Sequence, residues 1–173
     1  MRIYSAQYAQ IARDVVRALQ TRELIDVDAA NTDEAELDVV GVLREYNRMS
    51  RQINDMARDL AGPDGRANEM RIRRRLAREK DFVIGEDALE YVVNQIIEAL
   101  VQSTHIEEVY GSDRELRAVV TPIVDRHTQD RENELDAAVR SRIKNLAEGS
   151  ASWDIEYERV MQQVRRNKGL ADD

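Results

Sequence analysis

The 173-residue sequence contains no cysteine, and glycine, proline and aromatic residues are scarce. Without cysteine, a disulfide framework, a thiol nucleophile and a thiolate metal site are all excluded. Seven glycines and two prolines leave few turns, and aromatic residues, which favour strands, make up only 5% of the chain. Charged residues, mostly helix formers, make up 35%. This composition predicts an all-α fold whose core consists of apolar stripes on amphipathic helices.

Long apolar runs are also missing. No stretch is long enough to cross a bilayer, and the chain starts without the uninterrupted apolar segment of a secretion signal. The lack of cysteine suits a reducing compartment. We therefore expect a cytoplasmic protein with no membrane partner.

The net charge of −8 comes entirely from the second half of the chain. Residues 1–81 contain 15 Lys and Arg against 15 Asp and Glu, whereas residues 82–173 contain 11 against 19. Such a chain is not expected to bind nucleic acid or an anionic membrane through its overall charge. Any such binding would need a local basic patch.

Apolar residues recur at helical spacing in the first part of the chain. One stripe predicts a first helix and consists of Tyr8, Ile11, Ala12, Val15, Val16 and Leu19. A second helix is expected from about residue 31 to residue 61, ending at Gly62-Pro63. Its predicted buried stripe consists of Leu37, Val40, Leu43, Tyr46, Met49, Ile53, Met56 and Leu60.

The pattern of the first helix returns 81 positions later. This shift places Val15 on Ile96, Leu19 on Leu100 and Ile25 on Ile106. Because the agreement continues beyond the helix itself, it favours a duplication over the chance similarity of any two amphipathic helices. We expect an elongated, two-lobed protein of two related helical modules, about six to eight helices and no sheet. The modules are residues 1–81, ending in a basic linker helix at about 66–81, and residues 82–173.

The second module is expected to contain a capped helix, an interruption and a final helix. Ser112 and Glu115 have the spacing of a capping box. Pro122 and the polar run 128–134 predict two helices here, or one sharply bent helix, closed by Gly149. A final helix should follow Ser150 and end near Gly169. Its predicted buried face consists of Trp153, Tyr157, Val160, Met161 and Val164, with Leu146 in the preceding core stripe.

The C-terminal part carries the most distinctive pattern. Its residues are Val139-Arg140, Arg142-Ile143, Leu146, Glu148-Gly149-Ser150, Trp153-Asp154-Ile155, Tyr157 and Lys168-Gly169. Together with Leu76 to Lys80, Phe82-Val83-Ile84 and the start Met1-Arg2-Ile3, this pattern resembles the DUF507 family, bacterial helical proteins of unknown function. The resemblance implies an all-helical, two-lobed shape and a structural signature at Gly149, Ser150, Trp153, Asp154 and Tyr157. It implies no catalytic residues. After Tyr157 the chain departs from the family, which tends to have further tyrosines and glutamates there.

No motif in the chain indicates catalysis. His105 and His127 lack a companion at metal-ligand spacing, and we expect each to lie at the surface or at a helix end. The carboxylates of Asp130, Glu132, Glu134 and Asp136 fall in a polar, solvated stretch. The glycines form neither nucleotide-binding fingerprint, and no nucleophile elbow is present. We predict no catalytic residue, no metal site and no cofactor.

The segment from Arg66 to Lys80 is strongly basic, with seven Lys and Arg against two Glu. On a helix, one continuous cationic face would contain Arg71, Arg74, Arg75 and Arg78, with Met70, Ile72, Leu76 and Ala77 making apolar contacts. This face can be solvated or internally paired, can bind nucleic-acid phosphates, or can meet an acidic protein surface, including the chain's own second half.

Interaction, rather than catalysis, is the function that these features favour. Trp153 and Tyr157, one turn apart, are expected to lock the last helix onto its neighbour rather than to form a ligand platform. The narrow apolar stripes favour a scaffold or adaptor with an unknown protein partner or with a second copy of the chain, as a homodimer. The alternative is an RNA-associated protein that uses the Arg-rich helix 66–80.

Overall fold

The computed structural model describes residues 2–62, 65–144, 147–168 and 170. Pro63, Leu146 and Gly169, which the sequence offered as helix ends or as a core residue, lie outside the described residues.

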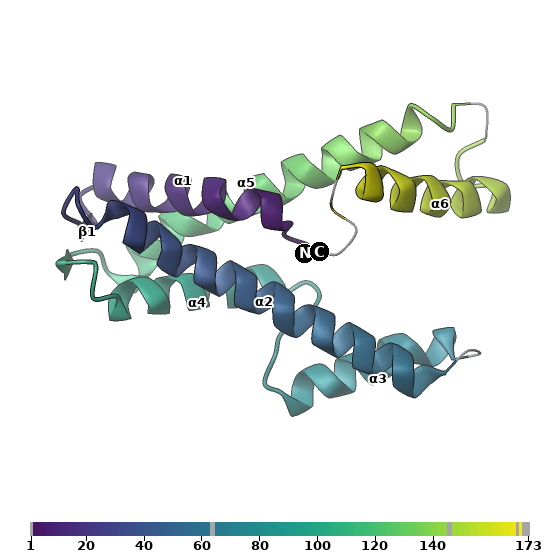
Figure 1. Ribbon diagram of the computed structural model, residues 1–173, viewed down its shortest axis with the longest axis horizontal. Helices are drawn as coiled ribbons and strands as arrows, with labels where there is room; N and C mark the ends of the chain where they lie inside the picture. Colours follow the sequence, from purple (N-terminus) through teal and green to yellow (C-terminus); the bar gives the residue numbers. More distant parts are fainter. Residues whose placement is uncertain (1, 63–64, 145–146, 169, 171–173) are drawn as a thin grey trace.

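Helices make up most of the described chain (Figure 1). The six α-helices are α1 (Tyr8–Thr21), α2 (Thr32–Ala61), α3 (Arg66–Glu79), α4 (Ala88–Gln102), α5 (Asp113–Arg140) and α6 (Ala151–Asn167), and a 3₁₀ turn, η1, covers Ser5–Gln7. The all-α prediction is confirmed. Within the described ranges, the only strands are β1 (Ile25–Asp26) and β2 (Glu108–Val109), which pair antiparallel with Ile25 opposite Val109. In the same ranges, no helix combines the length and apolar character needed to cross a bilayer.

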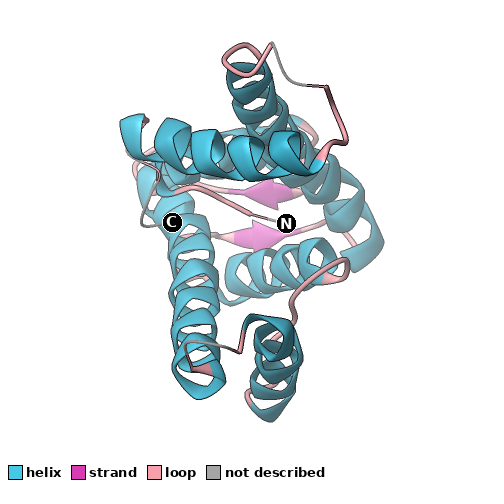
Figure 2. Cartoon of the chain, turned by 90° about the vertical axis from the view of Figure 1, so that its right-hand side faces the viewer, coloured by secondary structure: helices cyan, strands magenta, loops and turns pink. Residues whose placement is uncertain are grey.

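The two halves of the chain have the same order of elements. Each consists of a helix, a short strand, a long helix and a further helix. The strands β1 and β2 pair with each other, and Figure 2 shows them side by side among the helices. Helices α1 and α4 each pack against both long helices, α2 and α5. This order is what a duplicated module would give, and the duplication itself stays a prediction.

One large core joins the two halves. It contains fully buried residues from α1, α2, α4 and α5, for example Val15, Val39, Val92 and Val120. From this body, the end of α2 with α3 and the end of α5 with α6 extend as two diverging arms (Figure 1). A second, smaller core fills the α5–α6 arm and consists of Tyr4, Leu135, Val139, Ile143, Val160, Val164 and Leu170. The boundary near residue 81 therefore does not separate the cores.

The buried face of α2 differs from the predicted stripe. Leu37 is 55% exposed and Leu60 is 59% exposed, whereas small residues such as Ala35 and Ala57 are fully buried. The reason is that α2 packs against α1, α3 and α4 at once. A helix with three neighbours is buried on several sides, and close approach of the backbones favours small side chains over a stripe of large ones.

Of the two alternatives predicted for the stretch after residue 112, two helices or one bent helix, the structure excludes the first. A single helix, α5, runs through Pro122 and through the whole polar run 128–134, and it ends at Arg140 rather than near Gly149. Its start is as predicted, because Ser112 and Glu115 form the reciprocal capping box. Buried residues on both sides of the proline, Val119 and Val124, lie in the same core and hold the helix together. Tertiary packing here outweighs the local cost of proline.

Candidate functional site

The cationic face predicted for the basic segment is exposed on α3. Arg71, Arg74, Arg75 and Arg78 all have exposed side chains, and Arg75 lies 3.5 Å from the Glu79 carboxylate. On the other side of α3, Leu76 and Ala77 are buried and Ile72 is half-buried. Met70 was expected to join these contacts, but it is 50% exposed, since it lies at the edge of the buried face. The four arginines thus share one solvent-facing surface.

One arginine of the segment behaves differently. Arg73 is half-buried, and its Nε atom is buried without a hydrogen-bond partner. Its position follows from spacing, because residues 69, 72, 73, 76 and 77 lie on the face of α3 that packs against α2. Arg73 is not among the arginines predicted from the sequence, because it does not share the exposed face of Arg71, Arg74, Arg75 and Arg78. The sequence feature that indicates an inward position is that Arg73 lies among the apolar residues of the helix, next to Ile72 and three positions before Leu76.

The proposed signature residues lie in the α5–α6 arm. Gly149 has φ = 81°, which glycine adopts without strain, and Ser150 caps α6 by accepting a hydrogen bond from the Trp153 N–H at 3.2 Å. Trp153 stacks on Tyr157 with ring centroids 4.8 Å apart. Asp154 is exposed in the first turn of α6, where its charge suits the helix dipole. Trp153, although only half-buried, and Tyr157 also pack against the small core that α6 shares with α5.

Tyr157 and Arg140 link α6 and the loop before it to α5. The Tyr157 hydroxyl donates to Asp136 Oδ1 at 2.6 Å, and Arg140 lies 2.7 Å from the carboxylates of both Asp136 and Glu148. The hydrogen bond from Tyr157, together with Arg140, lowers the pKa of Asp136. Burial and the bond to Asp136 raise the pKa of Tyr157 to about 12. At neutral pH the phenol is protonated and the carboxylate ionised, so the pair is a structural link rather than an acid–base couple.

The two histidines have different surroundings. His105 is half-buried in the loop after α4. For His127, the expectation of a surface or helix-end position is wrong: its side chain is 18% exposed in the middle of α5, and Nε2 lies 2.7 Å from the Asp14 carboxylate on α1. Packing of α1 on α5 brings the two together, which no local pattern indicates. Among the described residues, no three His, Cys, Asp or Glu side chains are grouped to hold a metal ion.

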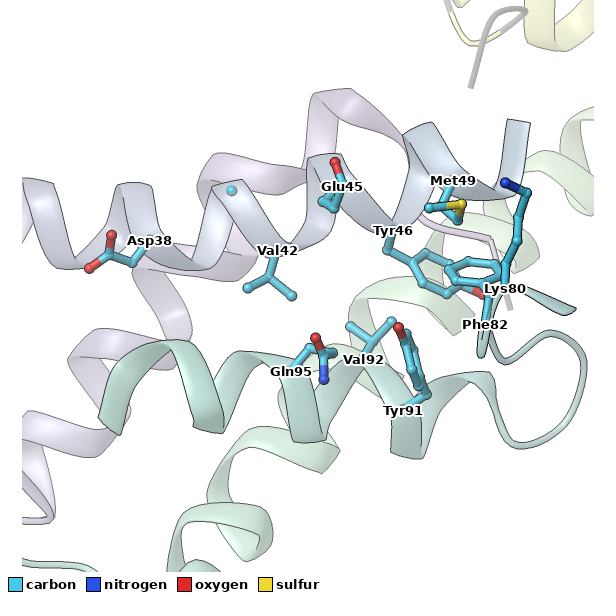
Figure 3. A pocket seen from close by; sticks show the side chains of 11 residues that line it. Asp38, Val42, Glu45, Tyr46, Met49, Lys80, Phe82, Tyr91, Val92 and Gln95 are labelled. Carbon is cyan, nitrogen blue, oxygen red and sulfur yellow. The ribbon is translucent and has the colours of Figure 1, made fainter. Parts of the chain in front are cut away.

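A groove between α2 and α4 is the clearest candidate site (Figure 3). Its volume is about 380 Å³, and its apolar lining comes from Val42, Tyr46 and Met49 on α2, Tyr91 and Val92 on α4, and Phe82 before α4. The three rings form a cluster: Phe82 lies 5.0 Å from Tyr46 and 5.6 Å, edge-on, from Tyr91 between ring centroids. The helical pattern predicts Tyr46 only as a buried residue of α2, and no local pattern links the three rings, since they come from separate elements.

Polar groups line the rest of the groove. Asp38, Glu45, Lys80 and Gln95 contribute to its lining, and Asp38 accepts a hydrogen bond from Ser103 Oγ at 2.5 Å. Figure 3 shows Tyr91 and Gln95 rising from α4 toward α2. Burial raises the pKa of Tyr46, and the hydrogen bond from Arg48 lowers that of Glu45. The Tyr46 phenol is therefore protonated and the Glu45 carboxylate ionised at neutral pH, which suits binding rather than proton transfer.

Gly41 also lines the groove, in the interior of the 30-residue α2. A Cβ atom built on Gly41 would have nothing within 4 Å, so the space above this part of the helix is open. Glycine inside a helix costs about 0.5–1 kcal/mol relative to alanine. Gly41, which lowers the stability of the helix, therefore stands where the groove reaches the backbone of α2.

Comparison with known proteins gives one positive result. The model of the family described as "Protein of unknown function (DUF507)" matches residues 1–170. A search of curated proteins finds no match.

Proposed function

Because the chain belongs to the DUF507 family, whose function is unknown, we propose its role from the geometry: it is a non-catalytic interaction module that holds a partner protein in the α2–α4 groove. The observation that carries this proposal is the groove itself, in which three clustered rings and the open space over Gly41 lie side by side along two helices. Apolar clefts with a few polar groups at their edges are the usual form of binding sites.

The rings supply the attraction. Tyr46 is 6% exposed and Phe82 is 7% exposed, whereas Tyr91 is half-buried. An apolar side chain that enters the groove would cover the remaining ring surface, and each Å² of apolar surface removed from water contributes about 25 cal/mol. Aromatic residues are enriched among the residues that dominate binding energies at interfaces.

The charges at the groove indicate what the partner carries. Asp38 and Glu45 lie along α2, and Lys80 lies toward the aromatic cluster. The chain as a whole has a net charge of −8. A complementary segment would place a large apolar residue on the rings and a basic residue toward Asp38 and Glu45. We therefore propose that the occupant is a segment of another protein, with an apolar anchor residue beside a lysine or arginine.

Gly41 offers a test that separates binding from folding. Gly41→Leu would fill the groove with a side chain that meets no atom at its Cβ position, and Gly41→Ala would make the same improvement in helix propensity without filling it. We expect random 12-residue peptides selected by display on the wild-type protein to share an apolar residue next to a basic one. They should bind Gly41→Ala as well as the wild type and bind Gly41→Leu at least tenfold more weakly.

Two outcomes would contradict the proposal. Selected peptides that bind Gly41→Leu and the wild type equally would show that the groove is not their site. A concentration-dependent dimer in sedimentation experiments that Gly41→Leu abolishes would identify a second copy of the chain as the occupant, in place of a foreign partner.

RNA association through α3 is the second candidate. It is favoured by the exposure of Arg71, Arg74, Arg75 and Arg78, of which only Arg75 has a carboxylate partner among the described residues. Binding to single-stranded RNA would weaken with salt, with a log–log slope of about −0.7 for each phosphate neutralised. Replacing the four arginines by glutamine should remove that binding and leave the peptide binding unchanged. RNA binding that survives the replacement would exclude this face.

A further inference from the structure

A second cavity lies on the other side of α2, away from the groove. Its volume is about 300 Å³, and it is formed by the N-terminal segment, α2, α3 and the turn before α4. Polar side chains dominate its lining, which consists of Arg2, Tyr46, Asn47, Ser50, Arg51, Asn54, Arg73 and Gly85. Three of these residues are arginines and none is acidic. A cavity with three cations and no lining carboxylate has the electrostatics of an anion site.

Arg73 gives the strongest indication of a missing ligand. Its Nε–H is buried and has no acceptor, and Arg73 forms no ion pair with a described residue. Leaving a charged donor buried without a partner is unfavourable, because the group loses hydration and gains nothing in return. An anion in the cavity would supply the acceptor. The guanidinium group is well suited to this role, since its donors match the oxygens of a phosphate or a carboxylate in pairs.

The neutral residues of the lining can complete the site. Asn47 donates through Nδ2 to the Ile3 carbonyl and to the Tyr8 hydroxyl, each at 2.5 Å, and so holds the N-terminal segment that carries Arg2 beside α2. Burial raises the pKa of Tyr46, although the nearby charge of Arg73 opposes this shift. The phenol is therefore protonated at neutral pH and can donate. Ser50 and Asn54 add a hydroxyl and an amide on the same side of α2.

We propose that this cavity binds the phosphate group of a small phosphorylated compound. Three guanidinium groups from three separate segments can surround a tetrahedral dianion, which offers more acceptor positions than a carboxylate or a chloride ion. A small ligand suits a cavity of about 300 Å³ that is lined by four segments of the chain. A nucleic-acid strand would need an open surface, which the exposed arginines of α3 provide instead. The site shares Tyr46 with the groove and none of the other groove-lining residues, so a change at Arg73 tests the cavity without altering the lining of the groove.

The test is the binding of inorganic phosphate and inorganic pyrophosphate to the full chain, measured by ³¹P NMR line broadening and by calorimetry. Sodium chloride keeps the ionic strength constant, so that general screening does not contribute. The main variant is Arg73→Gln. Its matched control is Arg71→Gln, which removes the same charge from the exposed face of the same helix.

We expect the wild type and Arg71→Gln to bind alike, and Arg73→Gln to bind at least tenfold more weakly. If Arg73→Gln fails to fold, Arg51→Gln, whose side chain is exposed, should show the same loss. We expect a functional site to have a Kd of about 0.1 mM or lower, so that 10 mM phosphate is roughly 100 times the Kd. Absence of binding by the wild type at this concentration would overturn the proposal. Equal weakening in Arg71→Gln and Arg73→Gln would also overturn it, because only general charge would then matter.

Discussion

Replacing Asn47 by alanine should destabilise the protein far more than the same replacement of a typical polar residue on a helix surface. Asn47 lies in the middle of α2 and is 6% exposed. Its amide donates to the carbonyl of Ile3, which is fully buried, and to the hydroxyl of Tyr8 at the start of α1. One side chain therefore connects α2, α1 and the N-terminal segment.

The expected cost follows from these two bonds. A typical intramolecular hydrogen bond contributes about 0.5–1.5 kcal/mol net, and an acceptor left buried and unsatisfied costs about 1–3 kcal/mol. The Ile3 carbonyl would lose its Asn47 donor, whereas Tyr8 has another interaction and would lose less. We therefore expect Asn47→Ala to lower the free energy of unfolding by about 2–4 kcal/mol, a large part of the usual 5–15 kcal/mol.

Urea denaturation followed by circular dichroism at 222 nm measures this difference. Asn54→Ala is the control, because Asn54 lies about two turns further along the same side of α2 and is half-buried. Its cost should stay within about 0.5 kcal/mol. Tyr8→Phe and the double variant with Asn47→Ala should reveal a coupling energy of about 0.5–3 kcal/mol, as expected for residues in contact.

If Asn47→Ala lowers the free energy of unfolding no more than Asn54→Ala does, Asn47 does not connect these segments as described. A zero coupling energy with Tyr8→Phe would show that the hydrogen bond between Asn47 and the Tyr8 hydroxyl does not contribute to stability. Either result would mean that another contact positions the N-terminal segment.

Three other changes give measurable outcomes. Gly41→Ala should raise the free energy of unfolding by about 0.5–1 kcal/mol, visible as a higher urea midpoint, since its Cβ enters open space; a lower midpoint would contradict that geometry. Trp153→Ala should cost about 1–3 kcal/mol, below the 3–5 kcal/mol typical of a fully buried tryptophan, because the ring is half-buried but stacked on Tyr157; unchanged thermal melting would exclude its packing role. Tyr157→Phe should raise the pKa of Asp136 toward its ordinary value, measured by NMR titration, because the hydrogen bond from Tyr157 lowers it. Since a lowered carboxyl pKa stabilises the fold above the unfolded-state pKa, the stability difference between Tyr157→Phe and the wild type should be full at neutral pH and shrink as the pH falls below about 4; a difference independent of pH would exclude this linkage.

Local patterns predicted the elements well. The stripe of α1 from Tyr8 to Leu19 is buried throughout, and the capping box at Ser112 is formed as expected. Such features depend on residues within one or two turns of each other, so the sequence contains all the information required. The family resemblance, which rested on residues spread from Met1 to Gly169, is confirmed by the match to residues 1–170.

Predictions failed where a neighbour distant in sequence decides. The exposure of Leu37 and the burial of Ala35 depend on the helices that surround α2, and the continuity of α5 through Pro122 depends on packing on both sides of the proline. The pairing of His127 with Asp14 needs α1 and α5 to meet.

The candidate sites also differ in whether local sequence or tertiary packing determines them. Helical spacing by itself determined that Arg71, Arg74, Arg75 and Arg78 share a face. The scarcity of glycine, proline and aromatic residues, together with the many helix formers, determined the fold class. Only the tertiary structure brought Phe82 and Tyr91 against Tyr46, and only it turned Arg73 inward to a cavity with Arg2 and Arg51. The physical reason is that a helix face is set by a local period of 3.6 residues, whereas a site is set by which faces pack together, and that depends on the whole chain.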